Sequence, residues 1–318
     1  MSGTVHRPLV SVISIFLNGD AFFAEAVDSV LAQTCQDFEL LLVDDGSTDR
    51  STGIARHYEA TYPGRVRYLE HPGHANRGMS ATRNLGIAAA QGRYIAFIDA
   101  DDVWRSEKLN EQIAIMDAHP SAGMVCGAVN YWRSWASGGE DVIVPTGHLT
   151  DRMSPPPEAM LALYPLGVAA APCPSDLLLR ADIVRAVGSF EAHFTGAQMM
   201  YEDQGFLAKL YLRAPVYFSG RTWTLYRQHA DSCVAAVTSD GRYHEVRRYF
   251  LEWLETYVAA RPEVDRRVVA ALQRSLRRYR RPKLDAALRG MRTAAHHLPG
   301  LPIAAGRMAR KWMRSFAT

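Results

Sequence analysis

The stretch Tyr94-Ile-Ala-Phe-Ile-Asp99-Ala-Asp101-Asp102-Val-Trp104 joins a run of apolar residues to a cluster of acidic ones. Its first half is a run of apolar and β-branched residues, which predicts a buried strand. Its second half holds three carboxylates within four residues. In an open α/β sheet, parallel strands deliver their ligand groups at their carboxyl ends, so these acids are expected at the mouth of a crevice. Because neighbouring carboxylates repel one another, a hard cation is the expected neutraliser.

Strand-like and helix-like segments alternate around that stretch. Apolar runs predict strands over residues 9–16, 38–43, 65–70 and 94–99. Helical spacing of apolar residues predicts helices over 22–31, 50–60, 80–90 and 107–118. This alternation is typical of a parallel sheet with helices on both faces, and right-handed crossovers place its strand carboxyl ends along one edge. Asp44 and Asp45 are therefore expected to share a crevice with Asp99 and Asp101.

Local signals predict how the chain turns at these ends. Gly46 permits a tight turn after the second strand, and Ser47 or Thr48 is expected to cap the next helix. Gly92 is expected to end a helix at its C′ position. Asp102 is expected to cap a helix that the chain enters directly after it.

The second half of the chain is less regular. Short apolar runs predict strands over 123–131, 176–180, 216–218 and 223–227. Helices are predicted over 181–187 and 202–212, with a loop over 195–200 and a long excursion over 132–157. After about residue 239 the pattern is helical, with Arg-rich faces.

Composition and charge narrow the class of protein. An apolar content of 48% and a charged content of 22% over 318 residues are ordinary for a soluble globular protein. Residues 261–318 hold 15 Lys and Arg against 3 Asp and Glu, so a basic tail follows an acidic body. The four cysteines are scattered, no export signal is recognisable, and no apolar run is long enough to span a membrane. We expect a cytoplasmic protein, and peripheral attachment to the inner face of the membrane stays open.

Five motifs occur in the order seen in family 2 glycosyltransferases, which the chain resembles over roughly residues 8–235. They are Val10-Ser-Val-Ile-Ser…Asn18, Val43-Asp-Asp-Gly-Ser-Thr-Asp49, Arg83-Asn-Leu-Gly86, Asp99-Ala-Asp-Asp102 and Glu202-Asp203. The resemblance implies the GT-A fold, a Rossmann-like α/β architecture with a mostly parallel sheet and flanking helices. It also implies sugar transfer from a nucleotide donor with inversion. Residues 1–238 would form the catalytic domain, with a nucleotide-sugar half over about 1–130 and an acceptor half over about 131–238. Residues 239–318 would form a basic helical C-terminal region.

The resemblance also assigns the donor site. Its donor-binding residues are Asn18, Asp44, Asp45, Arg83, Asp99 and Arg227. Asp45 would hold a uracil-type imide with support from Asp44, and Asp99 would reach the ribose. Taken alone, the Asp44-Asp45 pair also fits an Asp-rich turn that caps a helix. Where many relatives carry a Tyr before the Asn, this chain has Phe16-Leu17-Asn18, which leaves the identity of the base open.

The resemblance assigns the remaining site residues to metal binding and to removal of the acceptor proton. The resemblance implies Mn²⁺ or Mg²⁺ bound by Asp101 and His229, because such ions suit oxygen ligands and phosphate. It implies Asp203 as the base that takes the acceptor proton, with Glu202 orienting the acceptor or the helix. Two acids at the start of a helix are also favoured by the helix dipole, which is the simpler interpretation of Glu202 and Asp203.

These inferences lead to one expected function and two alternatives. We expect an inverting, metal-dependent glycosyltransferase that moves a sugar from a nucleoside diphosphate, most readily a UDP-sugar, to a hydroxyl acceptor. The acceptor would be a glycan or a lipid-linked or cell-surface polysaccharide precursor. A nucleotidyltransferase acting on sugar phosphates is one alternative, although it favours a Gly-rich loop where Asn18-Gly19-Asp20 stands. A non-catalytic sugar-binding or membrane-scaffold module is the other.

The basic region 261–318 allows two interpretations. Arginines alternate with apolar residues in a pattern that can lie on anionic lipid headgroups. The same pattern fits helices that pack on the catalytic domain with solvated Arg faces. No nucleic-acid-binding motif is present, so no nucleic-acid partner is expected.

Overall fold

The computed structural model describes residues 7–136, 139–230 and 232–288. The chain divides into two compact units, Met1–Leu272 and Gln273–Thr318. The first unit holds the sheet and every predicted site residue.

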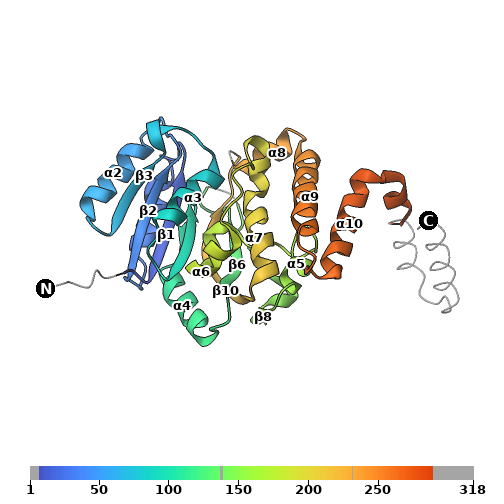
Figure 1. The fold of residues 1–318 in the computed structure, drawn as a ribbon. Helices are drawn as coiled ribbons and strands as arrows, with labels where there is room; N and C mark the ends of the chain where they lie inside the picture. The colour runs from blue at the N-terminus through green and yellow to red at the C-terminus, as the bar shows by residue number, and fades with distance from the viewer. Residues whose placement is uncertain (1–6, 137–138, 231, 289–318) are drawn as a thin grey trace. The chain divides into compact units, whose positions relative to one another are not determined.

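The first half of this unit alternates strand and helix as predicted (Figure 1). Its strands are β1 Val10–Phe16, β2 Phe38–Asp44, β3 Val66–Glu70 and β4 Tyr94–Asp99. Its helices are α1 Phe23–Leu31, α2 Ser51–Thr61, the 3₁₀ turn η1 Pro72–His74 and α3 Met79–Ala89. The strands lie in the order β3-β2-β1-β4, and all their pairings are parallel.

The register of these strands brings the acidic ends together. Phe16 at the end of β1 pairs with Asp44 of β2, and its neighbour Ile15 pairs with Asp99 of β4. The two acidic strand ends therefore flank the end of β1 at one edge of the sheet. This confirms the predicted convergence of Asp44 and Asp99.

The second half completes the sheet with shorter elements. Its strands are β5 Val103–Trp104, β6 Met124–Trp132, β7 Val142–Val144, β8 Arg152–Ser154, β9 Leu178–Arg180 and β10 Val216–Arg227. Its α-helices are α4 Lys108–Ala118, α5 Glu158–Ala162, α6 Ala181–Val187, α7 Glu202–Arg213, α8 Cys233–Ser239 and α9 Tyr243–Ala259, and α10 Arg266–Arg280 follows. Its 3₁₀ turns are η2 Gly147–Leu149, η3 Pro174–Asp176 and η4 Gly196–Tyr201.

The resemblance implied a sheet that is only mostly parallel, and the sheet does contain antiparallel strands, although the sequence pattern did not predict which strands these are. Its order continues β4-β9-β6-β10-β5, and β9 runs antiparallel to both of its neighbours. The two final strands predicted over 216–218 and 223–227 are one strand, β10, whose register with β6 shifts twice. Strand β5 pairs with β10, so the turn after β4 carries the chain from the middle of the sheet to its far edge.

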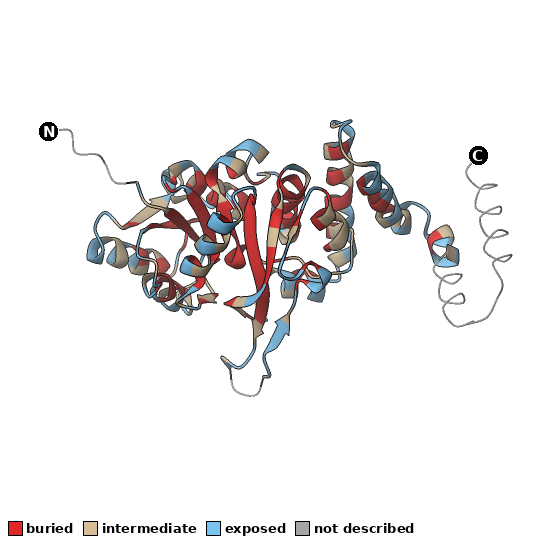
Figure 2. Ribbon diagram, turned by 90° about the horizontal axis from the view of Figure 1, so that it is seen from below, coloured by how far each residue is buried: buried red, intermediate tan, exposed pale blue. Residues whose placement is uncertain are grey.

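The core lies on the central strands. Every residue of β1 and β2 is buried, and Figure 2 shows the central strands almost wholly in the buried colour. Gly92 has a packing role instead of the predicted C′ role, because α3 ends at Ala89 and Ala90 is its cap. A Cβ on Gly92 would lie 2.5 Å from the backbone nitrogen of Ser11, so only glycine lets the chain approach β1 this closely.

The capping predictions near the site are wrong. Helix α2 has no side-chain cap. The Ser47 hydroxyl instead accepts a hydrogen bond from the backbone N–H of Asn18 at 3.1 Å. Asp102 caps no helix, because Val103 and Trp104 form strand β5. These polar side chains are used to tie distant loops together.

Candidate active site

Asp44 organises the turn that follows β2. Its side chain is buried, and its Oδ1 accepts hydrogen bonds from the backbone N–H groups of Gly46 at 3.1 Å and Ser47 at 2.8 Å. Its Oδ2 accepts from the hydroxyls of Thr52 at 2.6 Å and Tyr68 at 3.1 Å. With four donors around it, Asp44 holds the turn, as a supporting residue would.

Asp45 is held by a loop from elsewhere in the chain. Its carboxylate accepts from the N–H of Arg77 at 2.7 Å and of Gly78 at 3.0 Å. The ring of His74 bridges the same loop to the turn, facing a Glu70 carboxylate oxygen at 2.7 Å and the Ser47 carbonyl at 2.8 Å. The sequence indicated polar residues in this loop but did not show that it folds over Asp45.

Asn18 joins the end of β1 to the same turn. Its backbone has a φ of 51°, which asparagine tolerates better than most residues. Its side-chain oxygen accepts from the N–H groups of Thr48 at 2.7 Å and Asp49 at 3.3 Å. The neighbouring Phe16 is buried against Phe23, with ring centroids 4.2 Å apart, so it points into the core and cannot stack on a base.

Arg83 links β4 to α7. Its guanidinium is buried and donates to an Asp99 carboxylate oxygen at 2.5 Å and to the carboxylate of Glu202. Burial lowers the pKa of Arg83, but the two carboxylates outweigh this effect and raise it. In this structure the guanidinium of Arg83 is therefore hydrogen-bonded to two side chains of the protein, Asp99 and Glu202.

Glu202 and Asp203 begin helix α7, as predicted. Burial raises the pKa of Glu202 against the opposing effect of Arg83. Burial also raises the pKa of Asp203 to about 6, and the backbone N–H of Gln204, 2.6 Å from its Oδ1, opposes that rise. A carboxylate with a raised pKa is a stronger base than an ordinary aspartate.

The turn Asp99–Asp102 carries the acids of the opening stretch. Asp101 is one-third exposed, and its Oδ2 lies 2.9 Å from Nε2 of His229. Asp102 is fully buried and accepts from the hydroxyl of Ser175 at 2.5 Å. Burial raises the pKa of both Asp99 and Asp102, and the charge of Asp101 adds to the effect.

Arg227, the last residue of β10, holds this turn from the opposite side. Its Nε donates to the carbonyl of Asp101 at 2.7 Å, and a terminal nitrogen donates to Glu25 at 2.5 Å. The guanidinium lies 4.4 Å from the ring centroid of Phe22 and 4.3 Å from that of Trp132. The sequence predicted a donor contact for Arg227 but not this enclosure, because the aromatic residues come from two other elements.

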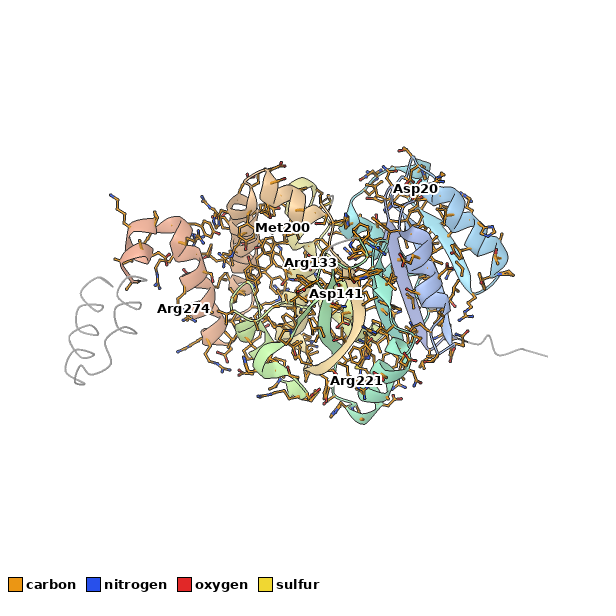
Figure 3. All side chains as sticks on the ribbon, turned by 180° about the vertical axis from the view of Figure 1, so that it is seen from behind. Asp20, Arg133, Asp141, Met200, Arg221 and Arg274 are labelled. Atoms are coloured by element: carbon orange, nitrogen blue, oxygen red, sulfur yellow. The ribbon has the colours of Figure 1, made fainter. Side chains whose placement is uncertain are left out.

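The hairpin after β6 supplies one wall of the enclosure. Trp135 lies 5.0 Å from the Arg227 guanidinium, and its indole N–H donates to the Gln228 carbonyl at 3.1 Å. Asp141, labelled with Arg133 in Figure 3, accepts from the backbone N–H of Arg133 at 3.0 Å. Part of the long excursion predicted over 132–157 is thus ordered around the site.

The residues at the turn fit a divalent cation. Among the described residues, no group of three or more His, Cys, Asp or Glu side chains could hold a metal ion. Asp101 and His229 nevertheless place a carboxylate oxygen and a ring nitrogen 2.9 Å apart. Mg²⁺-type ions are commonly held by one or two carboxylates with substrate phosphates and water completing the shell, so this pair suits an ion that arrives with a diphosphate.

Together these contacts bring the predicted site residues into three connected groups. The first contains Asn18, Asp44 and Asp45, the second contains Arg83, Asp99, Glu202 and Asp203, and the third contains Asp101, Arg227 and His229. The turn Asp99–Asp102 joins the second group to the third, and the β1–β2 and β1–β4 pairings set the first beside them.

Comparison with known families identifies a match over more than half of the chain. A family model described as "Glycosyl transferase family 2" matches residues 11–182. The uncharacterized glycosyltransferase EpsJ of Bacillus subtilis is 47% identical over 95 residues, which are 30% of this chain and 26% of EpsJ. TuaG of the same organism, a putative teichuronic acid biosynthesis glycosyltransferase, is 40% identical over 111 residues, which are 35% of this chain and 42% of TuaG. The chain thus spans less than half of the length of these relatives.

Solved structures share the fold at low sequence identity. The structure of TarS of S. aureus, residues 1–349 in complex with UDP-GlcNAc, matches this chain with a TM-score of 0.62 at 18% identity. The match covers 84% of this chain and 72% of the TarS chain. The mannosyltransferase PcManGT from Pyrobaculum calidifontis, in complex with GDP-Man and Mn²⁺, has a TM-score of 0.58 at 17% identity. That match covers 97% of this chain and 81% of PcManGT.

Proposed function

The chain belongs to glycosyl transferase family 2 and has the GT-A fold, and on this basis we propose an inverting, metal-dependent sugar transfer. The donor in this proposal is a nucleoside diphosphate sugar, and the acceptor is a hydroxyl group. One observation carries it. The contacts from Asp99 through Arg83 to Glu202 bring Asp203, a carboxylate with a pKa of about 6, to the acidic end of β4.

The proposed chemistry is a single displacement. Asp203 takes the proton of the acceptor hydroxyl as that oxygen attacks the anomeric carbon. The new bond joins the anomeric carbon to the acceptor oxygen, and the bond to the diphosphate oxygen breaks with its electron pair leaving on the diphosphate. One displacement inverts the anomeric centre. Glu202, held by Arg83, keeps the start of α7 in place during this step.

The donor is proposed to lie across the ends of β1, β2 and β4. Asp45 keeps lone pairs free beyond those used by Arg77 and Gly78, since an ionised carboxylate offers about four acceptor positions. It is proposed to accept the imide N–H of a uracil-type base, and Asp99 is proposed to meet the ribose. A UDP-sugar is the preferred donor on this chemistry, and the structural neighbours with UDP-GlcNAc and GDP-Man support a nucleotide-sugar in general.

Asp101 and His229 are proposed to hold Mn²⁺ or Mg²⁺ together with the donor diphosphate. The bound ion would offset the charge that develops on the leaving diphosphate. Asp102, which is bonded by Ser175 and Arg227, holds the turn that carries Asp101. The Mn²⁺ in the PcManGT structure supports a divalent ion here.

The basic C-terminal region is proposed to attach the enzyme to an anionic membrane surface from the cytoplasmic side. No helix in the described part of the chain is long and apolar enough to cross a membrane. In α10 the apolar residues Val268, Ala271 and Leu272 are buried, while Arg266 and Arg274 are exposed. Attachment would therefore be electrostatic, without insertion of an apolar face. The second basic piece, over 303–316, lies outside the described residues.

The acceptor is proposed to be a glycan or a lipid-linked precursor of a cell-surface polysaccharide. The name of TuaG, which concerns teichuronic acid biosynthesis, supports this class.

The proposed membrane attachment has a test of its own. Reversing the charge of Arg266 and Arg274 together should weaken co-sedimentation of the full chain with vesicles that contain phosphatidylglycerol. Equal sedimentation of the variant and the parent chain would contradict the attachment.

Donor binding provides the direct test of the proposed function. The full chain is heated with UDP-GlcNAc or GDP-Man, each in the presence of Mn²⁺ or of EDTA. A donor at 100 times its Kd should stabilise the fold by about 2.7 kcal/mol, and EDTA should remove most of that gain. Asp101→Asn should lose the Mn²⁺-dependent part, while Asp182→Asn, on the exposed surface of α6, should keep it. No stabilisation by any nucleotide-sugar with Mn²⁺ would overturn the proposal.

A further inference from the structure

We propose that Ser175, in the 3₁₀ turn η3, is a positioning residue for the metal and diphosphate site. The inference rests on the proposed function and deepens it. Ser175 lies 74 positions beyond Asp101 in the sequence and is not among the residues that the family motifs include. Its side chain is fully buried beneath the turn Asp99–Asp102.

The Ser175 hydroxyl touches both ends of this turn. It accepts a hydrogen bond from the backbone N–H of Asp99 at 3.0 Å and donates one to Oδ2 of Asp102 at 2.5 Å. Its own position is set by its carbonyl, which accepts from the Trp104 indole N–H at 2.7 Å and from the Thr224 hydroxyl at 3.2 Å. One hydroxyl therefore fixes where the turn begins and where it ends.

Arg227 closes the arrangement from β10. Its backbone N–H donates to Oδ1 of Asp102 at 3.0 Å, and its Nε donates to the Asp101 carbonyl at 2.7 Å. Asp102 is thus a buried bridge with Ser175 on one oxygen and Arg227 on the other. Between these supports, the side chain of Asp101 faces Nε2 of His229.

The consequence of losing the hydroxyl follows from this geometry. Without it, the Asp99 N–H and one oxygen of a fully buried carboxylate lack their partner, and such groups are costly to leave unsatisfied. The turn can relieve that cost only by moving. Because Asp101 lies between the two supported residues, the movement changes its position relative to His229. Loss of an outer-shell partner of this kind typically lowers metal affinity by about 10- to 100-fold.

The experiment compares Ser175→Ala with a matched buried serine. Ser154 in β8 is also buried, and its hydroxyl has no hydrogen-bond partner within the described residues. For each full-length variant, calorimetry measures UDP binding at increasing Mn²⁺ and in EDTA. Ser175→Ala should raise the Mn²⁺ concentration for half-maximal UDP binding by about 10- to 100-fold. Its UDP affinity in EDTA should match that of the parent chain, and Ser154→Ala should leave both quantities unchanged.

A second pair of variants tests that Ser175 acts through Asp102. Asp102→Ala should by itself raise the Mn²⁺ concentration needed for half-maximal UDP binding. Introducing Ser175→Ala into the Asp102→Ala variant should then cause a much smaller further rise than Ser175→Ala causes in the parent chain, because the effects of mutations at contacting residues do not add. If Ser175→Ala does not fold, Ser175→Cys replaces it in the same titration, since a thiol keeps a hydrogen-bonding group at this position but is a weaker donor. An unchanged Mn²⁺ requirement, or an equal rise in Ser154→Ala, overturns the inference. If the parent chain binds no nucleotide with Mn²⁺, the proposed function itself has failed.

Discussion

The two acidic strand ends of the sheet are held in different ways. Asp44, at the end of β2, receives its four hydrogen bonds from residues 2 to 24 positions away. The turn Asp99–Asp102, at the end of β4, is held by Ser175 and Arg227, which lie between 73 and 126 positions from the residues they contact. Asp44 is therefore held mainly by its own sequence neighbourhood, whereas the turn Asp99–Asp102 takes its shape only when η3 and β10 are in place.

This contrast indicates where each end is vulnerable. A turn that is satisfied by nearby donors keeps its shape when distant residues change. A turn that is satisfied from η3 and β10 transmits any change in those elements to Asp101. We therefore expect substitutions at the Asp44 end to affect stability and nucleotide binding but not the Mn²⁺ requirement. Substitutions in η3 or β10 that disturb the turn Asp99–Asp102 are expected to change the Mn²⁺ requirement from a distance.

The largest effect is expected at Asp203, which is connected to the β4 end through Arg83. Asp203→Asn should lower kcat by about 10²- to 10⁴-fold, because the amide cannot take the acceptor proton. Donor affinity, measured calorimetrically with Mn²⁺, should stay within a few fold of the parent value. Asp182→Asn serves as the control. Normal turnover in Asp203→Asn would remove this residue from the chemistry.

The next largest effect is a loss of stability when Arg83, which connects Asp99 at the end of β4 to Glu202, is replaced. Arg83→Met leaves the buried carboxylate of Glu202 and the partly exposed carboxylate of Asp99 without their partner, which should cost about 3–5 kcal/mol of stability in chemical denaturation. Arg50, whose side chain is 84% exposed and pairs with Asp20, is the matched control. Arg50→Met should change little, since exposed pairs are screened by water. Similar losses in both variants would erase the contrast between buried and surface pairs.

A smaller effect is expected at the locally built end. Asp44→Asn replaces an acceptor with a donor opposite the hydroxyls of Thr52 and Tyr68, which should cost about 1–3 kcal/mol of stability. UDP affinity should fall, while the Mn²⁺ concentration for half-maximal binding should not move. A shift in that Mn²⁺ requirement as large as in Ser175→Ala would show that the two ends are not independent.

The smallest effect is the pH dependence of turnover. The pKa of Asp203 is raised from 3.8 to about 6, so the base is half ionised at about that pH and is protonated progressively as the pH falls. The kcat should reach its plateau about one pH unit above this pKa and fall about tenfold for each unit well below it, at saturating donor and Mn²⁺. A profile that is flat between pH 5 and 7 would contradict Asp203 as the titrating base.

The regular part of the fold was predictable from the sequence. Strands β1 to β4 and helices α1 to α4 lie close to the ranges that apolar spacing predicts, because a buried parallel strand and an amphipathic helix each leave a local pattern. Strand β9, Leu178–Arg180, lies within the strand predicted over 176–180, but its antiparallel direction leaves no pattern in the sequence. The capping roles predicted for Ser47, Thr48 and Asp102 failed for a related reason, since a polar side chain near a turn does not reveal which distant loop it will meet.

The order of residues along the chain was enough to establish which strand ends carry carboxylates. Strand spacing and the alternation of helix and strand were also enough to bring Asp44 and Asp99 to one edge of the sheet. What holds these acids in place depends on tertiary contacts. The supports of Asp101 and Asp102 come from η3 and β10, and the aromatic enclosure of Arg227 comes from the start of α1 and the β6 hairpin. Such contacts depend on how separate elements meet in space, and hydrogen bonds between distant residues leave no periodicity in one sequence.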